Sequence, residues 1–169
     1  KEAREVAEAA RETSWEAPSF VRELFEGNFD LGLIHPFPEP SKEDVERAQP
    51  FMDRLEEFMR TRVDSDKIDR ESKIPADVIQ GLRDIGAFGI KIPTEYGGLG
   101  LSQLMYTKAI GLVTSQDGSM TALLSAAQSI GVPTPLKMFG TPEQKKKYLP
   151  RLARGAISAF ALTEANVGS

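Results

Sequence analysis

The residues best suited to chemistry lie in the last ten positions of the chain, residues 160–169. An apolar run leads to Thr163, and Val167, Gly168 and Ser169 then form a turn of small residues. The hydroxyls of Thr163 and Ser169 can donate hydrogen bonds, and successive backbone N–H groups in such a turn can bind an anion. The pattern therefore indicates contacts to a ligand, although an ordinary exit from a strand into a turn fits the same residues.

The composition narrows the chemistry that the chain can perform. Its 169 residues include no cysteine, which excludes thiol catalysis, disulfides and cysteine-ligated zinc. Because the sequence also has a single histidine, His35, we expect no metal site. The net charge of -4 has the wrong sign for a nucleic-acid binder. No run approaches the ~18 apolar residues that cross a bilayer, so we expect no transmembrane segment. Gly-rich dinucleotide and P-loop motifs are also absent from the sequence.

Helices must position these terminal residues, and we predict three regions. Residues 1–40 form an N-terminal extension, with an exposed helix over 1–13, a short amphipathic turn after Pro18 and a proline-rich extended linker over 31–40. Residues 41–157 form a helical domain, and residues 158–169 begin a β region with one strand. The predicted fold is thus an all-α bundle with the first strand of a following β-domain at its C-terminal end.

Capping residues and hydrophobic spacing predict the helices of this domain. We expect helices over 41–62, 75–86, 102–114, 119–138 and 141–149. Residues 64–66 (Asp-Ser-Asp) are expected to end the first helix and to separate it from the second. The helix over 119–138 is almost wholly apolar or small, which predicts a central helix surrounded by its neighbours.

Both ends of the chain suggest a piece of a longer protein. It begins without an initiator methionine, and it stops at Gly168 and Ser169 directly after the predicted strand. We expect more sequence on the C-terminal side, where a β region would continue.

Residues 160–169 resemble the flavin-contacting signature of the acyl-CoA dehydrogenase family, in which an aromatic residue, Leu or Val, Thr-Glu-Pro and a closing Gly-Ser-Asp recur. Three further stretches agree in order and spacing, namely 82–102, 128–131 and 139–153. The chain departs from the family at Ala165, where proline is usual, and it ends before the expected aspartate. Parts of the first forty residues, such as Pro36-Phe37-Pro38, are similar to the N-terminal extension of the very-long-chain branch.

The resemblance implies a flavoprotein oxidoreductase that uses FAD. The full protein would convert a long-chain fatty acyl-CoA to the trans-2-enoyl-CoA in fatty acid β-oxidation. Electrons would leave through an electron-transferring flavoprotein, and the protein would be a homo-oligomer, either a dimer or a tetramer. It would lie in the cytoplasm of a bacterium or in the mitochondrial matrix of a eukaryote. The general-base glutamate of the family lies beyond the chain end, so this chain carries no catalytic residue and is expected to be inactive alone.

The resemblance also assigns binding roles. Phe160, Leu162 and Thr163 match positions along the isoalloxazine of FAD, and Gly168 and Ser169 match the turn at its pyrophosphate. Ser169 also matches a position that touches the acyl-CoA. Four small residues fall in the helix that walls the acyl tunnel of the family: Ser125, Ala126, Ser129 and Gly131. Close packing of helices explains these four equally well.

Two other interpretations share this fold. The first is an acyl-CoA oxidase or flavin monooxygenase relative, in which oxygen replaces the flavoprotein acceptor. The second is a non-catalytic helical interaction or assembly module. A carboxylate base in the remaining C-terminal sequence would argue against the second.

Overall fold

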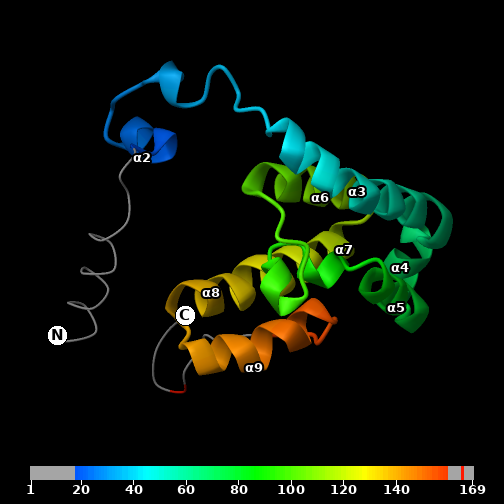
Figure 1. The fold of residues 1–169 in the computed structure, drawn as a ribbon. Coiled ribbons are helices and arrows are strands. Elements are labelled where there is room, and N and C mark those ends of the chain that lie inside the picture. Colours follow the sequence, from blue (N-terminus) through cyan, green and yellow to red (C-terminus); the bar gives the residue numbers. More distant parts are fainter. Residues whose placement is uncertain (1–17, 160–164, 166–169) are drawn as a thin grey trace. The chain divides into compact units, whose positions relative to one another are not determined.

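The computed structural model describes residues 18–159 and residue 165 (Figure 1). The predicted helix over 1–13 and the predicted strand from residue 160 onward lie outside these residues, and Ser158 and Ala159, where that strand was expected to begin, are not in a strand. Within the described part, every regular element is a helix, which confirms the all-α class. None of these helices combines the length and the apolar character that crossing a bilayer requires.

The chain divides into two compact units between Glu39 and Pro40. The described part of the first unit holds the helix α2 (Phe20–Phe25) and the 3-10 helix η1 (Leu31–Leu33). The helix η1 corrects the expectation of a wholly extended linker. It forms because the carboxylate of Asp30 accepts a hydrogen bond from the N–H of Gly32 at 2.9 Å, and the prolines begin only at Pro36.

The second unit begins with the long helix α3 (Lys42–Arg62). The N–H of Asp44 donates to the hydroxyl of Ser41 at 3.1 Å, so a capping serine begins this helix at the predicted position. One face of α3 buries a stripe at helical spacing, which consists of Ala48, Phe51, Leu55, Phe58 and Met59.

A short helix that the sequence did not predict follows at α4 (Ser65–Glu71). Asp64 begins it, because its carboxylate accepts from the N–H of Lys67 at 2.9 Å. The helix α5 (Ala76–Asp84) then starts one residue after Pro75, and Gly86 ends it with a φ of 84°.

The glycine-rich stretch 86–101 is an ordered loop that contains the 3-10 helices η2 (Ala87–Gly89) and η3 (Thr94–Tyr96). Backbone hydrogen bonds close it, since Leu99 donates to Gly89 at 2.8 Å and Gly100 donates to Ile92 at 2.8 Å. A side chain at Gly98 would overlap the Ile92 carbonyl group, so only glycine allows this close approach.

The helix α6 (Gln103–Thr114) matches its prediction, whereas the single helix predicted over 119–138 is wrong. The structure has three consecutive elements there: α7 (Gly118–Thr121), the π-helix η4 (Ala122–Gly131) and α8 (Pro133–Phe139). The break falls at Val132 because Pro133 has no N–H to continue the ladder and instead occupies the first turn of α8.

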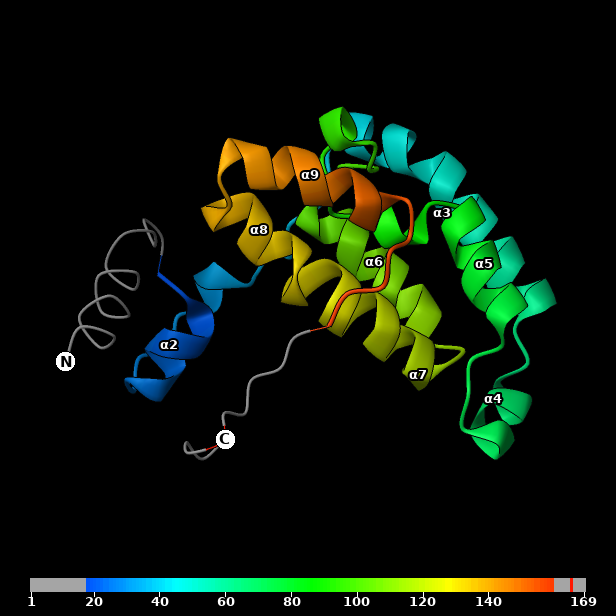
Figure 2. The same ribbon diagram turned by 90° about the horizontal axis from the view of Figure 1, so that it is seen from below.

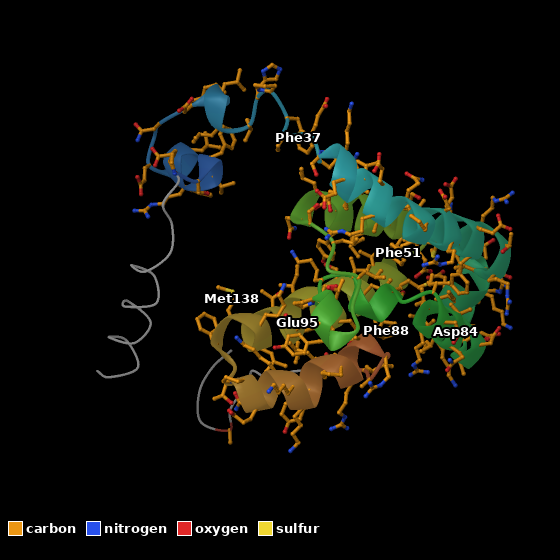
Figure 3. All side chains as sticks on the ribbon, in the orientation of Figure 1. Phe37, Phe51, Asp84, Phe88, Glu95 and Met138 are labelled. Atoms are coloured by element: carbon orange, nitrogen blue, oxygen red, sulfur yellow. The ribbon has the colours of Figure 1, made fainter. Side chains whose placement is uncertain are left out.

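The last described helix is α9 (Pro142–Ala153), which Thr141 begins with a capping box to Gln144. It packs on α8 (Figure 1) and forms a small second core from Ile92, Leu149, Leu152 and Ala153. The main core joins α3 to α6, α7 and η4. Figure 3 labels two of its largest buried side chains, Phe51 of α3 and Phe88 of η2.

Candidate functional site

An open groove of about 510 Å³ lies between α6 and η4. The helix η4 contributes Ser125 and Ile130 to its lining. The other lining residues are adjacent pairs that recur every four residues along α6 and its C-cap Ser115, so they share one face of that helix: Tyr106, Thr107, Ile110, Gly111, Thr114 and Ser115. Gly111 has no side chain, so α6 is narrow at this face. Nothing lies within 4 Å of the position that a Cβ would take there.

Tyr106 forms a rigid part of the groove wall. Only 4% of this residue is exposed, and its hydroxyl lies 2.8 Å from the hydroxyl of Ser125. The ammonium of Lys91 lies 5.4 Å from the centre of the Tyr106 ring. The Tyr106 side chain is therefore held both at its hydroxyl and over its ring. In the groove lining, the hydroxyls of Tyr106 and Ser125 satisfy each other's hydrogen bond.

Two lysines lie near Tyr106, Lys91 over its ring and Lys137 bonded to the backbone of Lys91. Lys91 donates to the side-chain oxygen of Gln103 at 2.5 Å, and Lys137 donates to the backbone carbonyl of Lys91 at 2.9 Å. Burial lowers the pKa of Lys91 below its ordinary value, and the neighbouring charge of Lys137 lowers it further. Because both effects disfavour the charged form, Lys91 loses its proton more readily than an exposed lysine.

The structure separates the four small residues that were predicted to bind the acyl chain. Ser125 lines the groove, and Ala126 beside it is exposed. Ser129 is buried, and its hydroxyl donates to the carbonyl of Leu124 at 2.7 Å instead of facing the groove. Gly131 is the last residue of η4. The remaining predicted contacts, Phe160, Leu162, Thr163, Gly168 and Ser169, lie outside the described residues.

The expectation of a central helix surrounded on all sides is also wrong for η4. Ala122, Ala126 and Ile130 follow one another at intervals of four residues and are exposed on this chain, Ile130 to 58%. The described helices cover only the side of η4 that carries Leu124, Gln128 and Ser129. An apolar helix thus leaves one apolar face open beside the groove.

Sequence reasoning missed the contribution of α6 to this site. The signal that could have found it is a glycine inside a mostly apolar helix, at a position where Tyr106, Ile110 and Thr114 recur on the same face. A glycine there lowers helix propensity, so its presence calls for a packing or functional reason.

Residues 46–156 match the model of the acyl-CoA dehydrogenase N-terminal domain. This match covers well over half of the chain, and the chain therefore belongs to the acyl-CoA dehydrogenase family.

Two relatives share the whole chain or nearly all of it. The probable acyl-CoA dehydrogenase FadE10 of Mycobacterium tuberculosis (strain ATCC 25618 / H37Rv) is 54% identical over 169 residues, which is 100% of this chain and 26% of that protein. The mitochondrial very long-chain specific acyl-CoA dehydrogenase of Mus musculus is 37% identical over 156 residues, which is 91% of this chain and 24% of that protein. The chain thus spans about a quarter of the length of these relatives.

A solved structure supports the same family. The acyl-CoA dehydrogenase of Bacillus anthracis complexed with FAD superimposes with a TM-score of 0.53 at 29% sequence identity. The superposition covers 77% of this chain and 22% of that chain.

Proposed function

We propose that the full-length protein is an FAD-dependent acyl-CoA dehydrogenase, which oxidises a long-chain fatty acyl-CoA to the trans-2-enoyl-CoA in β-oxidation. The observation that carries this proposal is the groove between α6 and η4, in a chain that belongs to the acyl-CoA dehydrogenase family. The identity to a very long-chain specific relative supports a long substrate.

The groove suits an acyl chain in size and in chemistry. Its volume of about 510 Å³ lies within the range of small-molecule sites. Ile110, Gly111 and Ile130 offer apolar contact, and each methylene removed from water there contributes about 0.8 kcal/mol. The hydroxyls of Tyr106 and Ser125 bond to each other, so an alkyl chain passing them leaves neither without a partner.

The donor set of the terminal segment suits FAD. The hydroxyls of Thr163 and Ser169, with the backbone N–H groups around Gly168, are donors of the kind that flavin carbonyl oxygens and a pyrophosphate accept. When bound, the flavin would accept a hydride from the β-carbon of the substrate. This chain would supply the acyl groove and part of the cofactor contacts, and a glutamate in the remaining sequence would remove the α-proton.

The partners of the full-length protein follow from the same family. We propose an electron-transferring flavoprotein as the electron acceptor and assembly into a homo-oligomer. A bacterial relative and a mitochondrial relative support placement in the bacterial cytoplasm, or in the mitochondrial matrix of a eukaryote.

The test is flavin reduction by the purified full-length protein without oxygen. We expect a yellow protein whose flavin is bleached by long-chain acyl-CoA more efficiently than by short-chain acyl-CoA, and whose reduced flavin is reoxidised by an electron-transferring flavoprotein. Rapid reoxidation by oxygen with release of peroxide would favour the oxidase alternative. A colourless protein that FAD does not reconstitute would contradict both.

A further inference from the structure

A buried glutamine joins η4 to the segment that follows α9. Gln128 is 1% exposed, and its amide nitrogen donates to the backbone carbonyl of Ser158 at 3.1 Å. The hydroxyl of Ser158 in turn lies 3.2 Å from the amide oxygen of Gln128 and 3.1 Å from the carbonyl of Ala127. We call this set of contacts the Gln128–Ser158 clamp.

The clamp lies where the chain returns from α9 and runs along η4 (Figure 2). The turn before it is fixed as well, because Arg83 donates to the carbonyl of Gly155 at 3.0 Å and Gly155 has a φ of 92°. Residues 155 and 158 are thus each tied to helices far away in the sequence. Beyond Ala159, the next residues in sequence are those predicted to contact the flavin.

Gln128 is an unusual residue for this position. It is the only glutamine among the buried residues of the described part, on a helix whose other buried side chains include Leu124. A buried amide costs stability unless its hydrogen bonds are made, and no buried side-chain nitrogen or oxygen in the described residues lacks a partner. Ser158 supplies the partners that make a glutamine acceptable here.

We propose that Gln128 is a positioning residue for the flavin-binding segment, an inference that rests on the proposed function. Two residues span at most about 7 Å, so fixing Ser158 restricts where a segment that begins at Phe160 can start. A segment held at its first residues loses less conformational freedom when it binds a cofactor, which raises affinity.

One helix then sets two parts of the site. The helix η4 presents Ser125 and Ile130 to the groove, and from its covered side it holds Ser158 through Gln128. The distance between the acyl groove and the start of the flavin segment is therefore fixed by a rigid element instead of a loop.

The test uses the full-length protein and measures its affinity for FAD. Gln128→Leu keeps the size of the side chain but loses the hydrogen bonds, and we expect the dissociation constant of FAD to rise about tenfold or more. Ser158→Ala is the second variant and should act in the same direction, whereas Ser158→Thr keeps the hydroxyl and should restore near-normal binding. Amide hydrogen exchange across residues 155–165 should be faster in the first two variants.

The matched control is Ile68→Val, which removes one buried methylene from α4, away from the clamp. We expect it to lower the melting temperature and to leave both FAD affinity and exchange at 155–165 unchanged. If Gln128→Leu and Ser158→Ala bind FAD like the wild type, the positioning role is wrong while the proposed function stands. If the wild type itself binds no FAD, the proposed function fails and this inference fails with it.

Discussion

Replacing Gly111 with leucine should shorten the acyl chains that the full-length protein accepts. Gly111 faces the groove between α6 and η4, and nothing lies within 4 Å of the place where its Cβ would be. The new side chain can therefore enter the groove without strain in the helix. Leucine also has a higher helix propensity than glycine by roughly 1 kcal/mol, so the variant should be at least as stable as the wild type.

The size of the effect follows from the methylenes that leucine displaces. Its side chain has four carbons, so it takes the place of about four methylenes of the substrate, each worth about 0.8 kcal/mol when buried. The loss is then about 3 kcal/mol, or roughly 200-fold in kcat/KM for a chain long enough to fill the groove. Gly111→Ala adds one carbon and should cost about fourfold by the same reasoning.

The assay compares kcat/KM for a short and a long saturated acyl-CoA in each variant. The short substrate should be unaffected, so the ratio of the two values carries the result. Gly118→Leu is the matched control, because Gly118 is also helical with nothing near its Cβ position but does not line the groove. An unchanged ratio in Gly111→Leu, or equal losses for both substrates, would refute the assignment of this groove to the acyl chain.

Three further predictions concern the stability of the full-length protein in urea or on heating. Gly98→Ala should destabilise it by about 3 kcal/mol or more, because the new Cβ would overlap the Ile92 carbonyl group and displace the loop. Asp44→Asn should cost about 1 kcal/mol near pH 7, and progressively less once the pH falls below the ordinary pKa of an aspartate. Hydrogen bonds from Ser102 lower the pKa of Asp44, and a carboxylate of this kind stabilises above its ordinary pKa and stops doing so as pH falls through its lowered one. Thr141→Ala removes the capping box of α9 and should cost about 1 kcal/mol, and an unchanged melting temperature would contradict it.

The sequence correctly predicted those helices whose ends are fixed by residues close in sequence, such as capping side chains. Ser41, Ser102 and Thr141 each accept a backbone hydrogen bond from the third residue after them, as their types and positions suggested. The helix α4 was missed because Asp64 was interpreted as a breaker. The same carboxylate that discourages a helix interior caps the next helix, and sequence alone does not say which role applies.

Tertiary contacts decided what the sequence could not predict. The run over 119–138, almost wholly apolar or small, suggested one surrounded helix, yet Pro133 divides it and one face of η4 stays open on this chain. The composition of a helix indicates that it is buried, but it does not indicate which of its faces is covered by another helix. The pairing of Tyr106 with Ser125 likewise depends on how α6 crosses η4, which no local pattern encodes.

The π-helical geometry of η4 explains why the groove could not be assembled from ordinary helical spacing. In an α-helix, Ser125 and Ile130 are five residues apart and point about 140° away from each other, so the two would not line one groove. The contacts within η4 and at its end run over five residues, as in the bond from the Ser129 hydroxyl to the Leu124 carbonyl and in that from Val132 to Ala127. Residues five apart in such a helix lie on the same side of it, much as residues four apart do in an α-helix, which brings Ser125 and Ile130 to the same wall. The wider helix is thus a requirement of the groove, and substitutions that restore α-helical spacing in η4 should remove Ile130 from it.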